Sequence, residues 1–243
     1  PEINKVGIAV PGMISKDRLS TVFMANIPEF NGVELIPILQ KTYPNISFFL
    51  ENDANAAALG ELHFAKTEVP QDFLFMTLGT GLGSAAVLDG KIFKGGEGNA
   101  MEAGHIISSN GKTAEENMGK AALVEMVLEE IKKGNTSAYN PNTLLAKDIV
   151  LGALDNEPVA VKIFEYVGTV LGEALVSTIR ILDLKTVFIG GGVSKTFHIV
   201  EKNMMKVLTD RLPDYYTNNL DIRLATLGNN AGIIGAASLC FKK

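Results

Sequence analysis

The chain has 243 residues, of which 47% are hydrophobic and 20% are charged, values that are ordinary for a soluble globular protein. Its net charge is −5 and it has no dense run of Lys and Arg, so we expect no direct contact with nucleic acid. A single cysteine, Cys240, excludes a disulfide within the chain and fits a reducing cytoplasm. No apolar run reaches the roughly 18–20 residues of a membrane span, and no signal peptide is visible, so we expect a cytoplasmic protein without membrane attachment.

Strands and helices are predicted to alternate along the first part of the chain. The apolar run at residues 4–10 ends in Pro-Gly, which is typical of a buried strand followed by a turn. Helical spacing predicts a helix over residues 32–41, and an alanine-rich stretch predicts a second one over residues 54–65. Short apolar runs predict strands at residues 46–50 and 73–78.

A β-hairpin is predicted next, because Asp89-Gly90 suits a type I′ turn between residues 84–88 and 91–93. Residues 94–104 form a glycine-rich loop, and residues 108–113 are polar and turn-like.

The second half of the chain is predicted to be mainly helical. Helices are expected at residues 119–134, 158–182, 195–212 and 231–239, with strands at 187–189 and 222–225. This order indicates an α/β fold with largely parallel sheets. Ligands in such folds usually lie beyond the carboxyl ends of strands, and three glycine clusters of this chain follow strands.

The segment Gly79-Thr80-Gly81-Leu82-Gly83 follows a predicted strand. Its glycines would let the backbone approach an anion, successive amides can point at phosphate oxygens, and Thr80 could add a hydroxyl donor. The same residues also suit a simple tight turn between two strands. The segment is not a Rossmann fingerprint, since a hairpin follows, and it lacks the Gly-Lys-Ser/Thr of a Walker loop.

The segment Glu51-Asn52-Asp53-Ala54-Asn55 closes a strand and opens a helix. Asn52 or Asp53 could be the N-cap of that helix. Alternatively, a carboxylate at the end of a strand could accept the proton of a substrate hydroxyl.

Two further segments could carry function, one after the glycine-rich loop and one after the predicted strand at residues 187–189. Glu102 and His105 lie three residues apart and could hydrogen-bond sugar hydroxyls, while His105 could also be a metal ligand or a buried structural residue. The run Gly190–Gly192 could let a nucleotide base or ribose lie against bare backbone. It could also form a strand-to-helix turn with Ser194 as the N-cap, and the two interpretations are compatible.

The order and spacing of these segments resemble the ROK family of repressors, open reading frames and kinases. The resemblance runs from about Lys5 to the C-terminus and rests on VPG (10–12), NIP (26–28), ENDANAAALGE (51–61), LGTGLG (78–83), DGKIFKGGEGNAMEAGH (89–105), IGGGVS (189–194) and LGNNAGIIGAA (227–237). It implies an actin-like (ribonuclease H-like) two-lobed sugar kinase fold. We expect an incomplete small lobe at residues 1–100 and a larger lobe at 101–243, with the final helix a candidate to return to the small lobe.

The resemblance also implies roles for individual residues. Asp53 matches the catalytic base, and the positions that match sugar contacts are Asn26, Asn52, Glu102, His105 and Glu125. The phosphate loop matches Gly79, Thr80, Gly81 and Gly83, and the nucleotide-side loop matches Gly190, Gly191 and Gly192. The implied function is an ATP- and Mg²⁺-dependent kinase of a hexose or N-acetylated hexosamine, expected as a homodimer. The alternative is the sugar-binding effector domain of a ROK-type transcriptional regulator, whose winged helix would lie upstream.

Two departures from the family pattern change what is expected. In most of the family a CxCGxxGCxE motif follows the His and helps to hold a structural zinc. Here Glu116, Met118 and Leu123 stand at the thiolate positions, so we predict no zinc and no other metal held by the chain itself. The last Glu of the motif is kept as Glu125, which could contact the sugar or be an exposed helical residue. The family's Asp-x-Gly-x-Thr phosphate hairpin would precede Pro1, so we expect either a partial sequence or a loss of catalysis.

Overall fold

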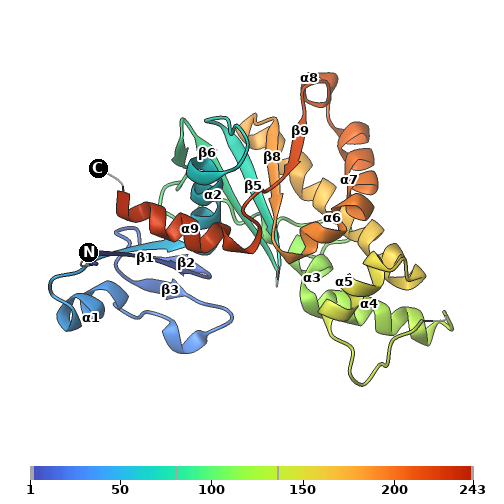
Figure 1. Ribbon diagram of the computed structural model, residues 1–243. Helices are drawn as coiled ribbons and strands as arrows, with labels where there is room; N and C mark the ends of the chain where they lie inside the picture. Colours follow the sequence, from blue (N-terminus) through green and yellow to red (C-terminus); the bar gives the residue numbers. More distant parts are fainter. Residues whose placement is uncertain (1–2, 80, 136, 242–243) are drawn as a thin grey trace. The chain divides into compact units, whose positions relative to one another are not determined.

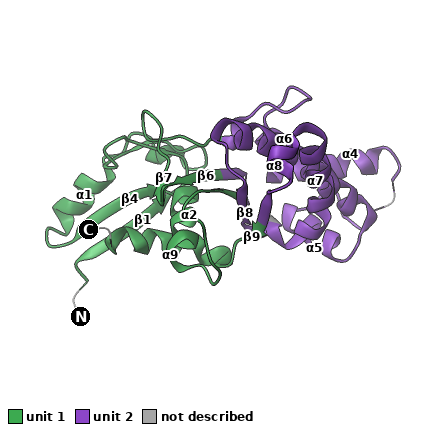
Figure 2. Cartoon of the chain, turned by 90° about the horizontal axis from the view of Figure 1, so that it is seen from above, with its two compact units in different colours: residues 1–76, 84–102, 223–243 green, residues 77–83, 103–222 purple. Residues whose placement is uncertain are grey.

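The computed structural model describes residues 3–79, 81–135 and 137–241 (Figure 1). The chain divides into two compact units (Figure 2). Unit 1 comprises Pro1–Met76, Ser84–Glu102 and Arg223–Lys243, and unit 2 comprises Thr77–Gly83 and Ala103–Ile222. None of the helices in the described ranges is long and apolar enough to cross a membrane.

Unit 1 begins with a parallel pair of strands, as the apolar runs predict. β1 (Lys5–Val10) pairs with β4 (Ser47–Asn52), in a register that runs from Lys5 opposite Ser47 to Val10 opposite Asn52. The connection contains helix α1 (Leu35–Thr42) and an antiparallel pair that the sequence did not predict, β2 (Met13–Ile14) with β3 (Thr21–Phe23). One hydrophobic cluster joins these elements: Ile14, Met24, Ile36 and Leu50.

Helices α2 (Asp53–Phe64) and α9 (Ala231–Ser238) lie side by side in unit 1 (Figure 1). Their backbones approach closely because glycines stand at the contact. A Cβ on Gly235 would collide with the carbonyl of Ala56, and a Cβ on Gly60 would collide with the carbonyl oxygen of Ala231. The sequence therefore sets the distance between these helices through residues that lack a side chain.

A buried carboxylate also ties α2 to the segment before α9. Glu61 is fully buried in α2, and it accepts hydrogen bonds from the Thr226 hydroxyl at 2.9 Å and from the Leu227 amide at 2.7 Å. These bonds satisfy the charged group in the interior, where an unpaired carboxylate would be very costly.

The remaining strands form one sheet in the order β7-β6-β5-β8-β9. Their bounds are Lys91–Ile92, Leu82–Leu88, Phe73–Leu78, Thr186–Gly190 and Asp221–Leu224, respectively. β6 and β7 pair antiparallel through a two-residue loop, in which Asp89 has φ 50° and Gly90 has φ 68°. Two positive φ values are what a type I′ turn requires, so the predicted hairpin is confirmed.

Unit 2 is mainly helical. Its helices are α3 (Ala114–Met118), α4 (Lys120–Lys132), α5 (Ala146–Leu154), α6 (Pro158–Leu182), α7 (Phe197–Arg211) and α8 (Asp214–Thr217). α6 has the predicted bounds, whereas α3 and α5 were not predicted. α6 packs along α7 through two close approaches, where Gly168 faces the Val200 carbonyl and Gly172 faces Val207 and the Met204 carbonyl oxygen.

The predicted start of α7 was wrong. Ser194 is not an N-cap, because its hydroxyl donates a hydrogen bond to the Gly191 carbonyl oxygen at 2.6 Å within a 3₁₀ helix, Gly192–Thr196. Thr196 occupies the N-cap position of α7 without a capping side-chain bond. The three glycines allow the chain to turn tightly before the helix begins.

Candidate functional site

The junction between β4 and α2 places Asn52 and Asp53 at the start of a helix. Asn52 is the N-cap, and its side-chain oxygen accepts hydrogen bonds from the amides of Ala54 at 2.9 Å and Asn55 at 3.1 Å. Its side-chain nitrogen donates to the Gly12 carbonyl oxygen at 3.1 Å. The capping role that the sequence allowed for either residue therefore belongs to Asn52, and Asp53 is left as the first helical residue.

The environment of the Asp53 carboxyl favours its protonated form. Desolvation raises its pKa above the usual value of 3.8, and the Ala54 amide, which donates to its Oδ1 at 2.9 Å, opposes that shift. No ion pair joins Asp53 to a cation in the described part of the chain. Asp53 is nevertheless exposed to solvent, so its carboxyl can be reached by a substrate. These properties suit a group that exchanges a proton.

The residue before Asn52 is a buried ion-pair centre that the sequence reasoning did not assign a role. Glu51 is 2% exposed, and its carboxylate lies 3.5 Å from Arg18 Nη1 and 3.3 Å from Lys94 Nζ. It also accepts hydrogen bonds from the Asn52 amide at 3.0 Å and from Asn55 Nδ2 at 3.1 Å. The carboxylate therefore contacts the loop between β2 and β3, through Arg18, and the loop that follows β7, through Lys94.

The glycine-rich loop that follows β7 is attached to the β2–β3 hairpin within unit 1. Asn99 accepts a hydrogen bond from the Ile14 amide at 3.0 Å and donates one to the Ile14 carbonyl oxygen at 2.9 Å. Arg18 Nη2 donates to the Gly98 carbonyl oxygen at 2.7 Å. This loop ends at Glu102, which is exposed. Asn26, another predicted sugar contact, is exposed in the turn after β3.

The predicted phosphate loop in unit 2 is a tight turn between β5 and β6. The Gly79 amide donates to the Gly81 carbonyl oxygen at 3.0 Å, and Gly83 already lies in β6. Open space lies where a Gly79 side chain would be, so the backbone there is accessible on that side. Thr80 lies outside the described residues.

A carboxylate of α3 lies against this loop. Glu115 Oε2 accepts a hydrogen bond from the Leu82 amide at 3.1 Å, and a Cβ on Gly81 would collide with the same carboxylate. A side chain at position 81 would therefore push the Glu115 carboxylate away from the Leu82 amide, a contact that the sequence did not reveal.

The three glycines after β8 lie in unit 2. Gly190 is the buried last residue of β8, and Gly191 has φ 84°. A Cβ on Gly191 would collide with the backbone of Leu78, so the turn packs tightly on the end of β5. Open space lies where a Gly192 side chain would be. Gly192 and Gly79 thus offer accessible backbone at the ends of two strands.

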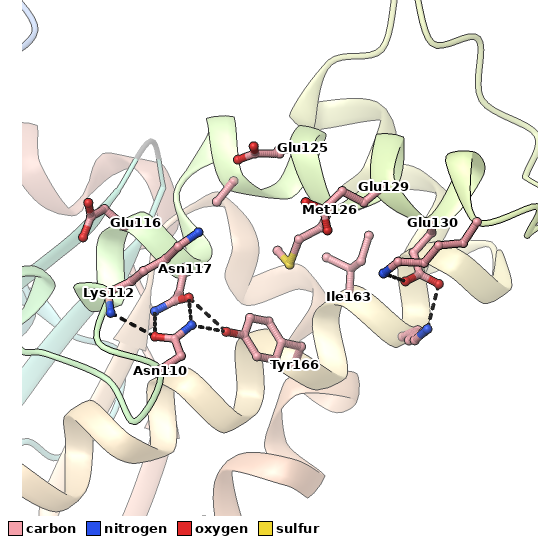
Figure 3. A pocket seen from close by; sticks show the side chains of 13 residues that line it. Asn110, Lys112, Glu116, Asn117, Glu125, Met126, Glu129, Glu130, Ile163 and Tyr166 are labelled. Atoms are coloured by element: carbon pink, nitrogen blue, oxygen red, sulfur yellow. Dashed lines mark hydrogen bonds and ion pairs between the residues drawn. The ribbon is translucent and has the colours of Figure 1, made fainter.

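A groove of about 340 Å³ lies between α4, α6 and residues 110–117 of unit 2 (Figure 3). At one end the Tyr166 hydroxyl and Asn110 Nδ2 donate to Asn117 Oδ1, at 2.9 and 2.7 Å. At the other end, hydrogen bonds from the ammonium groups of Lys162 and Lys133 hold the pKa of Glu130 at about 2. The polar side chains at both ends of the groove therefore form hydrogen bonds with one another.

The two remaining predicted sugar contacts are exposed residues of unit 2. His105 ends a short 3₁₀ helix, Ala103–His105, and is therefore not the buried structural residue considered above. Glu125 lies on α4 and lines the groove of Figure 3.

A model of the ROK family matches residues 1–243. The chain belongs to the ROK family. Among curated proteins, the glucokinase of Thermotoga maritima is 30% identical over 248 residues, covering 96% of this chain and 78% of that protein. The xylose repressor of Caldicellulosiruptor bescii is 26% identical, covering 96% of this chain and 61% of that protein. Relatives of this ROK chain thus include both glucokinases and regulators.

Solved structures agree on the fold of this ROK protein. A structure from Cytophaga hutchinsonii is 37% identical with a TM-score of 0.88, and the match covers 100% of this chain and 81% of that one. A ROK family glucokinase from Streptomyces griseus, solved with glucose and AMPPNP, is 26% identical with a TM-score of 0.84, and the match covers 100% and 83%. The fold is therefore the actin-like α/β fold of ROK sugar kinases, as the resemblance implied.

The positions that carry zinc ligands in most of the ROK family hold other contacts here. Glu116 forms a capping box with Thr113, accepting its amide at 2.7 Å, while Met118 and Leu123 are buried. Across residues 3–79, 81–135 and 137–241, no group of three or more His, Cys, Asp or Glu side chains could hold a metal ion. The absence of zinc from the working protein stays a prediction.

Proposed function

We propose that this ROK protein transfers the γ-phosphoryl group of ATP to a hydroxyl of a hexose or N-acetylated hexosamine. The observation that carries the proposal is the state of Asp53, a carboxyl at the end of β4 with a raised pKa and without a cationic partner in the described residues. Its neighbour Asn52 is fixed by three hydrogen bonds. A fixed amide beside a proton-accepting carboxyl suits the recognition and activation of a sugar hydroxyl.

The proposal assigns the proton acceptor to unit 1 and the nucleotide contacts to backbone groups of unit 2. Asp53 would accept the proton of the attacking hydroxyl, and the accessible backbone at Gly79 and Gly192 would hold the phosphates and the nucleoside of ATP. Mg²⁺ is expected as the counterion of the phosphates. Glu102, His105 and Glu125 are exposed carboxylate and imidazole groups, so they remain the candidate partners of the sugar hydroxyls.

The test is a coupled assay of ATP consumption with a panel of hexoses and N-acetylated hexosamines. In Asp53→Asn, turnover should fall by about 10²–10⁴-fold, while calorimetry still detects sugar binding, because the substitution removes only the proton acceptor. Asp214→Asn is the matched control, since Asp214 is likewise the first residue of a helix. Turnover of the Asp53→Asn protein at the wild-type rate would refute the proposal.

A second function is supported by the regulators among the relatives, such as the xylose repressor of Caldicellulosiruptor bescii. The chain would then be the sugar-binding effector domain of a regulator. In that case the wild-type protein binds a sugar of the panel and consumes no ATP with any of them.

A further inference from the structure

We propose that Glu51 is a positioning residue that holds the sugar-binding edge of unit 1 through Arg18 and Lys94, an inference that rests on the proposed function. These three residues are called the anchor cluster below. They come from the β2–β3 hairpin, the end of β4 and the glycine-rich loop, three segments that meet within unit 1.

Glu51 is a carboxylate that neutralises more than one cation. It is 2% exposed, and its two oxygens face different partners: Oε1 lies 3.5 Å from Arg18, and Oε2 lies 3.3 Å from Lys94. The side chain of Arg18 is 13% exposed and that of Lys94 is 41% exposed. Loss of the carboxylate would therefore leave the Arg18 charge largely buried without a counter-charge, whereas Lys94 already reaches water. Glu51 is the counter-charge on which the buried conformation of Arg18 depends.

Both cations are connected to the glycine-rich loop. Lys94 is the first residue of the glycine-rich stretch, and Arg18 donates from Nη2 to the Gly98 carbonyl oxygen in its middle. Arg18 itself has φ 63°, an uncommon left-handed conformation for a residue with a side chain, which the surrounding contacts must hold in place. The loop ends at Glu102, so the anchor cluster fixes the path of the backbone towards a proposed sugar contact.

The same carboxylate is attached to the Asn52–Asp53 junction. Glu51 Oε1 accepts the Asn52 amide and Asn55 Nδ2, which lie on either side of Asp53 in the sequence. A shift of this carboxylate would therefore move the N-cap residue and the proposed base together with the loop. Orientation matters for this chemistry, because a displacement of about 1 Å can lower a rate by about 10²-fold.

A second ion pair joins the same hairpin to the same loop and provides a matched control. Lys16 Nζ lies 3.3 Å from Glu97 Oε1, but these side chains are 65% and 86% exposed. Exposed ion pairs of this kind contribute little to stability, because water screens the charges and both side chains lose conformational entropy. If removing the Glu97 charge leaves sugar binding unchanged while removing the Glu51 charge weakens it, the effect is specific to the buried carboxylate.

The experiment compares Glu51→Gln, Lys94→Met and Glu97→Gln in the full chain. Calorimetry gives the sugar Kd, the coupled assay gives KM for sugar and for ATP, and thermal melting gives Tm. We expect Glu51→Gln to raise the Kd and KM for sugar by about 10–10²-fold and to leave the KM for ATP unchanged. We expect a smaller rise of the same kind for Lys94→Met and no change for Glu97→Gln.

A merely structural role would lower Tm without separating the two KM values. Unchanged sugar binding in Glu51→Gln would overturn the inference, and so would an equal effect of Glu97→Gln. If Glu51→Gln does not fold, Lys94→Met decides, since Lys94 can reach water and its removal leaves the Arg18–Glu51 pair intact. Unchanged sugar Kd in that variant would then overturn the inference.

The binding readout separates this inference from the proposed kinase activity. A wild-type protein that binds a sugar without consuming ATP refutes the kinase, while the Kd values of the variants still confirm or overturn the positioning role. A wild-type protein that binds no sugar of the panel overturns both.

Discussion

Two glycines of α9 should respond to the same substitution with opposite signs. Gly232→Ala adds a methyl group where the structure has open space, and Gly235→Ala adds one against the backbone of Ala56. Alanine is more favourable than glycine within a helix by up to about 1 kcal/mol, and this gain applies to both positions. Overpacking costs about 1–3 kcal/mol, and the upper value is expected at Gly235 because a backbone carbonyl cannot turn aside. The variants should therefore differ by about 3 kcal/mol in the free energy of unfolding.

Thermal melting measures this difference. For a chain of this size, about 1 kcal/mol shifts Tm by about 2–4 °C. Gly232→Ala should melt up to about 4 °C above the wild type, and Gly235→Ala about 4–8 °C below it. Equal shifts of the two variants would show that the close approach of α2 and α9 does not limit stability, and would refute the packing argument.

Three further predictions concern buried or shifted carboxyl groups. Because desolvation raises the pKa of Asp53, the folded state binds this proton more tightly, and stability falls as pH rises above the usual value of 3.8. Asp53→Asn should therefore raise Tm at pH 7, by a margin that shrinks as the pH falls towards 4. Glu61→Gln leaves one of two partly buried donors without its acceptor, so the free energy of unfolding measured in urea should fall by about 1–3 kcal/mol. The pKa of Glu130 is lowered to about 2, so its contribution to stability is complete above about pH 4.5 and is lost as the pH falls towards 2. An NMR titration of Lys162→Met should show the pKa of Glu130 moving back towards its usual range.

Much of the fold could be predicted because local pattern and tertiary packing agree. The apolar runs of β1, β4 and β5, the Asp89-Gly90 turn and the long α6 are all where the sequence placed them. The β2–β3 pair was missed because strands of two and three residues are too short to show an alternating pattern. α5 begins after Leu145, which lacks the polar side chain of a usual N-cap, so the start of this helix has no capping signal that could be recognised.

The candidate site shows a sharper limit. The Asn52–Asp53 junction could be located, because a polar segment between an apolar run and an alanine-rich helix is a local signal. The roles of Glu51 and Glu115 could not be predicted, because each contacts residues that are distant in sequence, such as Arg18 and Leu82. In the sequence alone, a Glu beside a strand end or in a polar segment is typical of the solvent-facing surface.

The arrangement of unit 1 also has a consequence for the order in which the protein matures on the ribosome. α2 packs on α9, and Lys5 Nζ donates to the Cys240 carbonyl oxygen, across 235 positions of the chain. At about 5–20 residues per second, translation leaves α2 without its partner for on the order of ten seconds. During that interval the small-residue face of α2 and one side of β1 are bare, so nascent chains that stop before α9 should be sensitive to proteases and chaperones. The part of unit 1 that contains β1 and α2 is therefore completed by α9, which is synthesised much later in the chain.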